Sequence, residues 1–138
     1  MKSFSWPVRV YYEDTDSGGV VYYANYLRFM ERARTEWLRS IGVEQDQLRD
    51  EQGVIFAVRR VEVDYLKPAR FNDNLEVTAK IVAQGRASLT FEQSVLRHDD
   101  GRPIELCQGS VKIACLDAVA FRPCPIPDDI KTEMRSVC

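Results

Sequence analysis

The hydrophobic pattern changes its period once along this chain, and that change restricts the fold more than any other feature of the sequence. Between residues 26 and 41 apolar side chains recur every three or four positions, at Tyr26, Met30, Ala33, Trp37 and Ile41. This spacing predicts one long amphipathic helix, and Gly42 fits the left-handed residue that ends such a helix. After Gly53 apolar and polar residues alternate, which predicts strands.

Five segments show the strand pattern. One precedes the helix, from Val8 to Tyr12, and four follow it, around residues 61–65, 75–83, 89–95 and 107–115. Turn-forming sequences separate the last four, and strands joined by short turns pair in the antiparallel sense. One helix covers only one face of such a sheet, so we predict an α+β fold in a single domain, residues 1–138. The other face is then exposed to solvent or covered by a partner chain.

The composition excludes several classes of function. The net charge of −2 argues against nucleic acid as the main partner. We find no signal-peptide pattern at the N-terminus and no segment with the roughly 20 apolar residues of a transmembrane helix, so we expect a cytoplasmic protein. Neither the four cysteines nor His98, the single histidine, has the spacing of metal ligands, so no metal is expected. We place His98 in a surface turn, and we expect Cys107 and Cys115 to face the core.

The segment YEDTDSGGVVYY, residues 12–23, places three carboxylates just before the predicted helix. The first N–H groups of a helix have no partner within it and lie at the positive end of its dipole. A carboxylate beside free amides around Tyr22, Tyr23 and Ala24 suits the hydrolysis of an activated acyl group. The alternative is structural, because Asp14 or Asp16 would also serve to cap the helix or stabilise the turn. Spacing alone favours this alternative.

The segment VRVYYEDTDSGGVVYYANYLRFMERAR resembles the hot-dog-fold acyl-CoA thioesterases. The resemblance is closest to the 4-hydroxybenzoyl-CoA thioesterase branch and its Tol–Pal-associated bacterial members. Further matches, RRVEVDYLKPARFNDNLEV and GRASLTFEQSV, extend it over nearly the whole chain. It implies a five-stranded antiparallel sheet wrapped around one long central helix. It also implies an acyl-CoA thioesterase that needs no cofactor and forms a homodimer or homotetramer. Acyl-carrier-protein thioesters, which carry the same phosphopantetheine arm as CoA, are candidates for a second substrate class.

The motif D-x-D-x-x-G-x-V-Y-x-x-N-Y carries the implied roles. Asp16, its second aspartate, is the catalytic carboxylate, acting as general base or nucleophile, and the backbone N–H of Tyr23 polarises the thioester carbonyl. Close Tol–Pal-associated members often have histidine where this chain has Tyr23, so no imidazole acts there. Tyr12 either lies near the site or packs under the helix. The implied substrate-binding residues are Tyr12, Gly19, Val20, Tyr22, Lys67, Arg70 and Arg86. The last three, with Arg59 and Arg60, are candidates for binding the CoA phosphates.

The sequence leaves two alternative functions. The first is a hot-dog dehydratase or hydratase, which uses a catalytic histidine. The only histidine here is His98, and its predicted place in a surface turn argues against this function. A non-catalytic interaction protein of the Tol–Pal or phospholipid-synthesis machinery is the second alternative. Tyr23 in place of histidine supports it, whereas the intact Asp16 and the glycine turn argue against it.

Overall fold

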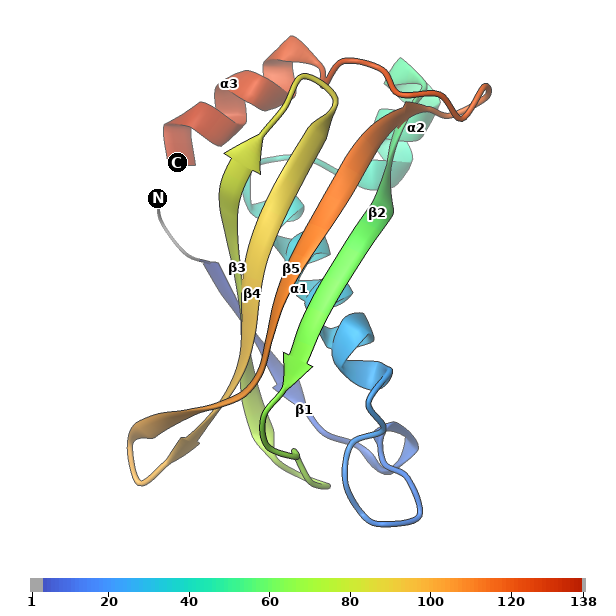
Figure 1. Cartoon of the computed structure of the whole chain (residues 1–138). Helices are drawn as coiled ribbons and strands as arrows, with labels where there is room; N and C mark the ends of the chain where they lie inside the picture. Colours follow the sequence, from blue (N-terminus) through green and yellow to red (C-terminus); the bar gives the residue numbers. More distant parts are fainter. Residues whose placement is uncertain (1–3, 138) are drawn as a thin grey trace.

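A five-stranded antiparallel sheet curls around a long helix (Figure 1). The structure is a computed structural model that describes residues 4–137, with side chains to residue 135. Its elements, in chain order, are β1 (Phe4–Arg9), the 3-10 turn η1 (Tyr12–Asp14), α1 (Asn25–Ser40), α2 (Gln45–Gln52), β2 (Val54–Tyr65), β3 (Asn74–Gln84), β4 (Ser88–Asp99), β5 (Arg102–Asp117) and α3 (Asp128–Val137). The strand order is β1-β3-β4-β5-β2, so β1 and β2 form the two edges.

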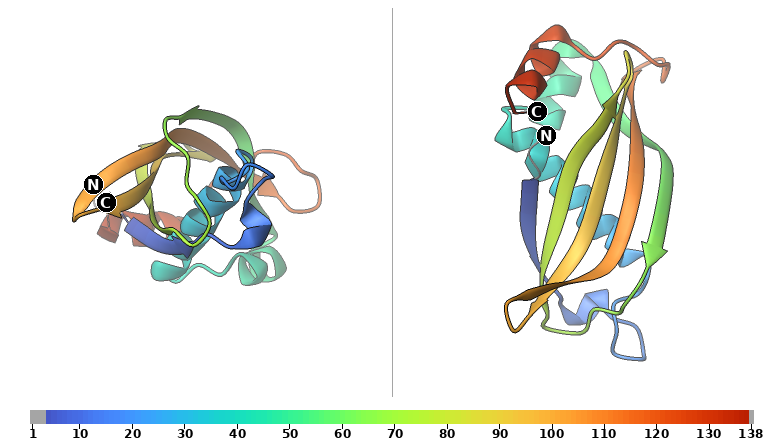
Figure 2. Two further views of the ribbon diagram at one scale, coloured as in Figure 1. Left: turned by 90° about the horizontal axis from the view of Figure 1, so that it is seen from below. Right: turned by 60° about the vertical axis from the view of Figure 1, so that its left-hand side comes forward.

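Helix α1 lies along the concave side of the sheet, as Figure 2 shows, and this is where its predicted apolar stripe is buried. Its five residues are all buried, with at most 6% of their surface exposed. Trp37 packs edge-on against Phe91 of β4, with ring centroids 5.4 Å apart. The helix ends at Ser40, and Gly42 has a φ of +86°, which confirms the predicted stop because a left-handed residue favours glycine.

A buried polar bridge fixes α1 along the sheet. The Nη1 of Arg34 donates to Oε1 of Gln93 on β4 at 2.9 Å. The amide nitrogen of Gln93 in turn donates to the carbonyl oxygens of Met30 at 3.0 Å and Thr78 at 3.1 Å. Burial lowers the pKa of the Arg34 guanidinium. Because each polar group needs its partner in a dry environment, sliding α1 along the sheet would break the whole bridge.

The apolar core has two parts. The first surrounds the C-terminal half of α1 and includes Leu48 of α2 and Ile130 and Met134 of α3. The second surrounds the N-terminal half of α1, where Phe29 and Met30 pack against residues of β1 and β3. The loop between β1 and α1 therefore rests on the second part.

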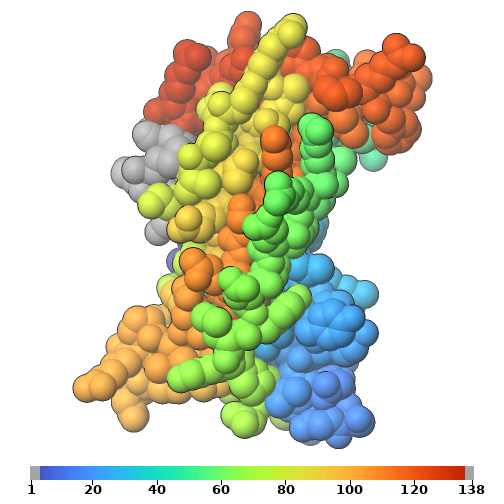
Figure 3. Space-filling model, viewed as in Figure 1, coloured from blue at the N-terminus to red at the C-terminus, as the bar shows by residue number. Residues whose placement is uncertain are grey.

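The outer face of the sheet is polar. Neighbouring strands place Glu62, Glu92, Ser110 and Lys112 on it, and a shallow hollow of about 480 Å³ lies over the first three of these residues. Figure 3 shows this face, with β2 along one margin. α1 covers the opposite face, as predicted.

Some expectations about the elements are wrong. The fold does not contain one helix alone, because α2 and α3 accompany α1. Helix α2 has a single buried residue, Leu48, and therefore no apolar stripe to reveal it. The strand predicted from Val8 to Tyr12 lies earlier, at Phe4–Arg9, and Tyr12 begins the turn η1. Tyr12 does not pack under the helix, since it is 75% exposed.

The expected burial of two cysteines is confirmed, as is the exposure of His98. Cys107 and Cys115 are fully buried. The side chain of His98 is about half exposed, at the end of β4 rather than in the turn itself, with its Nε2 3.6 Å from Oε1 of Glu76. Across residues 4–137, no helix combines the length and the apolar character that crossing a membrane requires.

Candidate active site

The chain between β1 and α1 forms a loop organised by Asp14. Its buried side chain accepts the N–H of Tyr11 through Oδ2 at 2.9 Å. Its carbonyl oxygen accepts two more hydrogen bonds at 2.9 Å, from the Tyr22 N–H and from Nδ2 of Asn25. Asn25, the first residue of α1, is also buried. These bonds tie the loop to the first turn of the helix.

Asp16 lies at the exposed tip of this loop. Its Oδ1 accepts the Gly18 N–H at 2.8 Å, and its carbonyl oxygen accepts the Gly19 N–H at 3.1 Å. Gly19 has a φ of +79°, and a Cβ on Gly18 would lie 3.2 Å from Oδ1 of Asp16. The Gly18 N–H thus holds the carboxylate against the backbone, and Gly19 completes the turn. Its Oδ2 has no hydrogen-bond partner among residues 4–137.

The structural alternative is correct in one respect. Asp16 stabilises the glycine turn, as an aspartate commonly does two residues before the amide that it accepts. However, α1 has no side-chain cap on its first N–H groups, so neither Asp14 nor Asp16 caps that helix.

The start of α1 has free backbone amides. Within residues 4–137, the N–H groups of Tyr23 and Ala24 have no acceptor. The Tyr22 N–H, in contrast, is bonded to the Asp14 carbonyl, so the expectation of a free amide there is wrong. Unpaired amides at the positive end of a helix stabilise negative charge on a nearby oxygen atom.

The segment after β2 closes the loop from the other side. The Val21 N–H donates to the Ala69 carbonyl at 2.8 Å, and the Ala69 N–H donates to the hydroxyl of Tyr26 at 3.0 Å. Val20 and Arg70 form an antiparallel bridge. Arg70 is therefore held beside the glycine turn, although its side chain is exposed.

Four tyrosines line the same end of the molecule. Tyr23 lies between Tyr22, with ring centroids 4.8 Å apart, and Tyr65, at 6.1 Å. Tyr65 also packs against the buried Tyr26, with ring centroids 5.6 Å apart. Burial raises the pKa of Tyr26 and of Tyr65, and a hydrogen bond with Tyr23 raises that of Tyr22. These three phenols are therefore neutral at physiological pH.

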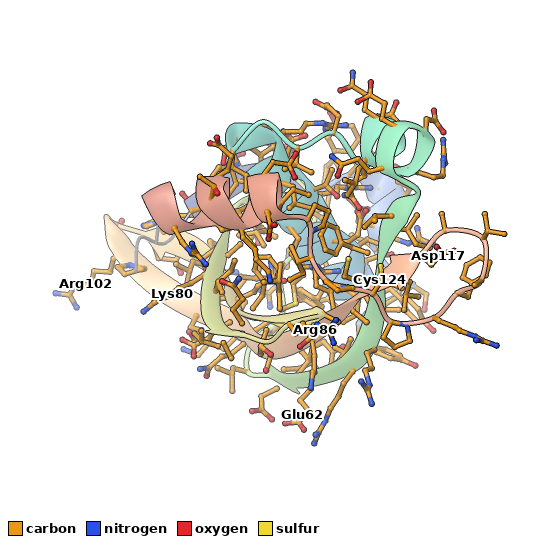
Figure 4. All side chains as sticks on the ribbon, turned by 90° about the horizontal axis from the view of Figure 1, so that it is seen from above. Glu62, Lys80, Arg86, Arg102, Asp117 and Cys124 are labelled. Atoms are coloured by element: carbon orange, nitrogen blue, oxygen red, sulfur yellow. The ribbon has the colours of Figure 1, made fainter. Side chains whose placement is uncertain are left out.

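The predicted phosphate-binding cations lie in different places. Lys67 and Arg70 are close to the loop, just beyond the end of β2. Arg86 lies in the turn between β3 and β4, at the opposite end of the sheet (Figures 1 and 4). Arg60 forms an ion pair with Glu62 on the outer face. One chain alone therefore does not bring all these cations together.

The site is flanked by an aromatic stack and has no group of metal ligands near it among residues 4–137. The exposed Tyr12 stacks on Phe71, with ring centroids 3.8 Å apart. Across the described residues 4–137, no three His, Cys, Asp or Glu side chains are grouped so as to hold a metal ion.

Residues 10–134 match the model of the thioesterase-like superfamily. The chain belongs to this superfamily. The acyl-CoA thioesterase YbgC of Haemophilus influenzae is 43% identical to it over 128 residues, 93% of this chain and 91% of that protein. The resemblance seen in the sequence motifs is thereby confirmed, as is the classification of the chain as a thioesterase.

Two solved structures share the fold. A probable thioesterase from Bartonella henselae has a TM-score of 0.84 at 32% identity, covering 91% of this chain and all of that one (100%). A 4-hydroxybenzoyl-CoA thioesterase in complex with 4-hydroxybenzoyl-CoA has a TM-score of 0.90 at 20% identity, covering 96% of this chain and 99% of that one.

Sequence reasoning missed two residues of this thioesterase's candidate site. Tyr65 entered the sequence pattern only as an alternating strand residue, and nothing in its spacing pairs it with Tyr23, 42 positions away. Asn25 is part of the motif, but the sequence alone assigned it no role. Its buried bond to the Asp14 carbonyl explains why an amide side chain is needed at the first position of α1.

Proposed function

We propose that this protein hydrolyses the thioester bond of an acyl-CoA. One observation carries the proposal: Asp16 and the Tyr23 N–H lie on the same short loop, the first with a free carboxylate oxygen and the second with no acceptor within residues 4–137. The names of the YbgC relatives, acyl-CoA thioesterase and acyl-CoA thioester hydrolase, support the choice of substrate.

The proposed reaction needs water and no cofactor. The Tyr23 N–H donates to the carbonyl oxygen of the thioester and stabilises the negative charge that develops there. Asp16 either takes a proton from the water that attacks the carbonyl carbon, or attacks that carbon itself to form a mixed anhydride, which water then cleaves. Both routes break the C–S bond and release the free acid and the CoA thiol.

We infer that the protein acts as a homodimer, formed through β2. This edge strand has 12 residues and a free side of unpaired N–H and C=O groups, which is a ready template for another strand. A two-fold axis pairs the two copies of β2 antiparallel. The end of one protomer that carries Arg86 then lies beside the end of the other that carries Lys67 and Arg70. We assign these three cations to the CoA phosphates.

The same reasoning extends to a tetramer and to a second substrate. Packing of two dimers through the polar outer faces would give a homotetramer. Acyl-carrier-protein thioesters present the same phosphopantetheine arm, and we propose them as alternative substrates. Because both kinds of thioester are made in the cytoplasm, we expect the protein to act there.

The test is an acyl-CoA panel with thiol release followed by a thiol reagent. We expect Asp16→Asn to fold and to bind acyl-CoA but to lose at least about 10²-fold in kcat. Glu13→Gln is the matched control, because Glu13 is an exposed neighbour without a role in the site. An Asp16→Asn variant that turns over within about twofold of the unmodified enzyme would remove Asp16 from the mechanism. Light scattering that shows only monomers at micromolar concentrations would refute the dimer.

A further inference from the structure

The loop after β5, residues 118–122, carries an unusually exposed apolar tip. Val119 is 89% exposed, the highest value among the large hydrophobic residues described, and Phe121 is 66% exposed. In Figures 1 and 2 the loop extends outward past the edge strand β2, and Figure 4 shows it beyond Asp117, clear of the body of the molecule. Single exposed apolar residues are common, but here two lie on one projecting loop, where a partner can reach both.

The loop is held in a defined shape. The Oδ1 of Asp117 accepts the N–H groups of Val119 at 2.9 Å and Ala120 at 2.7 Å, and the Asp117 N–H donates to the Arg122 carbonyl at 2.9 Å. Phe121 has a φ of +55°, a left-handed conformation that is unfavourable for a bulky residue. Strained residues of this kind cluster at functional sites.

The position of the loop determines what it meets in the dimer proposed above, on which this inference rests. The loop starts beside the N-terminal end of β2, where the Ala118 N–H donates to the Gly53 carbonyl at 2.8 Å. In a two-fold antiparallel pair, the Val54 end of one strand lies beside the Tyr65 end of the other. The loop of one protomer therefore projects toward the catalytic end of its partner.

The two surfaces match in chemistry. Tyr65 is 46% exposed and Leu66 is 53% exposed, and Tyr65 is in contact with Tyr23 of the catalytic loop. We propose that Val119 and Phe121 of one protomer pack against the partner's Tyr65 and Leu66 and complete the apolar wall of the partner's thioester-binding site. The loop contributes to substrate binding and not to the bond-breaking step.

The first test replaces Phe121 with glycine. The change Phe121→Gly removes the ring and leaves a residue suited to a φ of +55°, so the loop keeps its backbone shape. We expect KM for acyl-CoA to rise about tenfold with kcat nearly unchanged. The matched control is Asp100→Gly, another exposed left-handed position (φ +52°), in the β4–β5 hairpin. Its KM should not change. An unchanged KM in Phe121→Gly would overturn the proposal.

The second test establishes which chain the loop serves. Asp16→Asn and Phe121→Gly subunits with different tags are co-expressed, and the heterodimer is isolated by tandem purification. In that heterodimer, the chain that retains Asp16 meets the partner's intact Phe121. If the loop acts on the partner, kcat/KM per dimer is about half that of the unmodified enzyme. If the loop acts within its own chain, the value is about one-twentieth, and the proposal is wrong.

A third measurement does not depend on hydrolysis. Leu66→Cys and Phe121→Cys subunits with different tags are mixed and oxidised with glutathione disulfide. A linked pair of unlike subunits on a non-reducing gel, absent when either engineered cysteine is missing, supports the contact between chains even if no acyl-CoA is hydrolysed. A folded dimer that fails to link and shows no change in KM overturns the proposal while leaving the catalytic assignment of Asp16 intact.

Discussion

Two adjacent glycines, Gly18 and Gly19, should respond in opposite ways to the same substitution. Gly18 faces the carboxylate of Asp16, and an added Cβ would lie 3.2 Å from its Oδ1. Gly19 has no atom within 4 Å of an added Cβ, but its φ of +79° disfavours any other residue. Gly18→Ala therefore perturbs the position of the carboxylate, whereas Gly19→Ala strains the backbone.

The structure gives the size of each effect. Ordinary contacts start near 3.5 Å, so the Asp16 carboxylate must move by a few tenths of an ångström to admit the methyl group. Because misplacing a reacting group by about 1 Å costs about 10²-fold, we expect kcat of Gly18→Ala to fall about three- to tenfold. Gly19→Ala should lose about 1–2 kcal/mol of folding free energy, which corresponds to a fall in Tm of about 3–8 °C for a domain of this size.

The assay compares kcat for one acyl-CoA with Tm from circular dichroism for both variants. We expect Gly18→Ala to stay within about 1 kcal/mol of the original stability, and Gly19→Ala to keep its kcat within about twofold. If Gly18→Ala folds normally and retains full kcat, the glycine turn does not position the catalytic carboxylate. Equal losses of kcat in both variants would refute the separation of the two effects.

Three further predictions follow from single contacts. Asn25→Ala leaves the Asp14 carbonyl with one hydrogen bond fewer in a buried place and should cost about 1–3 kcal/mol in chemical denaturation; a smaller loss would mean that water replaces the amide. Hydrogen bonds from two loop N–H groups lower the pKa of Asp117. Its stabilising effect is therefore present above the ordinary aspartate pKa of about 3.9 and is lost as the pH falls through the lower folded value. The Tm gap between the unmodified protein and Asp117→Asn should close on acidification, and a gap independent of pH would contradict this. The double change Lys67→Gln and Arg70→Gln should raise KM for acyl-CoA most at low salt, while KM for a phosphate-free acyl-pantetheine, the control, stays constant.

The main elements of the fold were predictable because their apolar residues have a regular period. The stripe from Tyr26 to Ile41 identified α1, and the alternation after Gly53 identified four strands. Helix α2 was missed because it buries a single residue. Helix α3 was missed because it follows a proline-rich segment and because, among its side chains described up to residue 135, only Ile130 and Met134 are buried.

The candidate site was predictable only where its residues are neighbours in sequence. The motif brings Asp16, the glycines and Tyr23 into one loop, and the structure places them there. The bond from the Tyr22 N–H to Asp14 depends on how the loop folds back, and the contact of Tyr23 with Tyr65 depends on the register of β2. Periodicity carries no information about either, because both join segments whose relative position is set by tertiary packing.

The strand order also has a consequence for the synthesis of the chain on the ribosome. The first 65 residues contain α1 and both edge strands, β1 and β2, but none of the three central strands. Strand β1 pairs only with β3, and β2 pairs only with β5, whose last residue is Asp117. The apolar stripe of α1 therefore cannot pack against β3 and β4 until residue 99 has been made, and the sheet is complete only once β5 ends at Asp117. Folding of this protein is consequently a late event in translation, and the nascent N-terminal half is the form most exposed to aggregation.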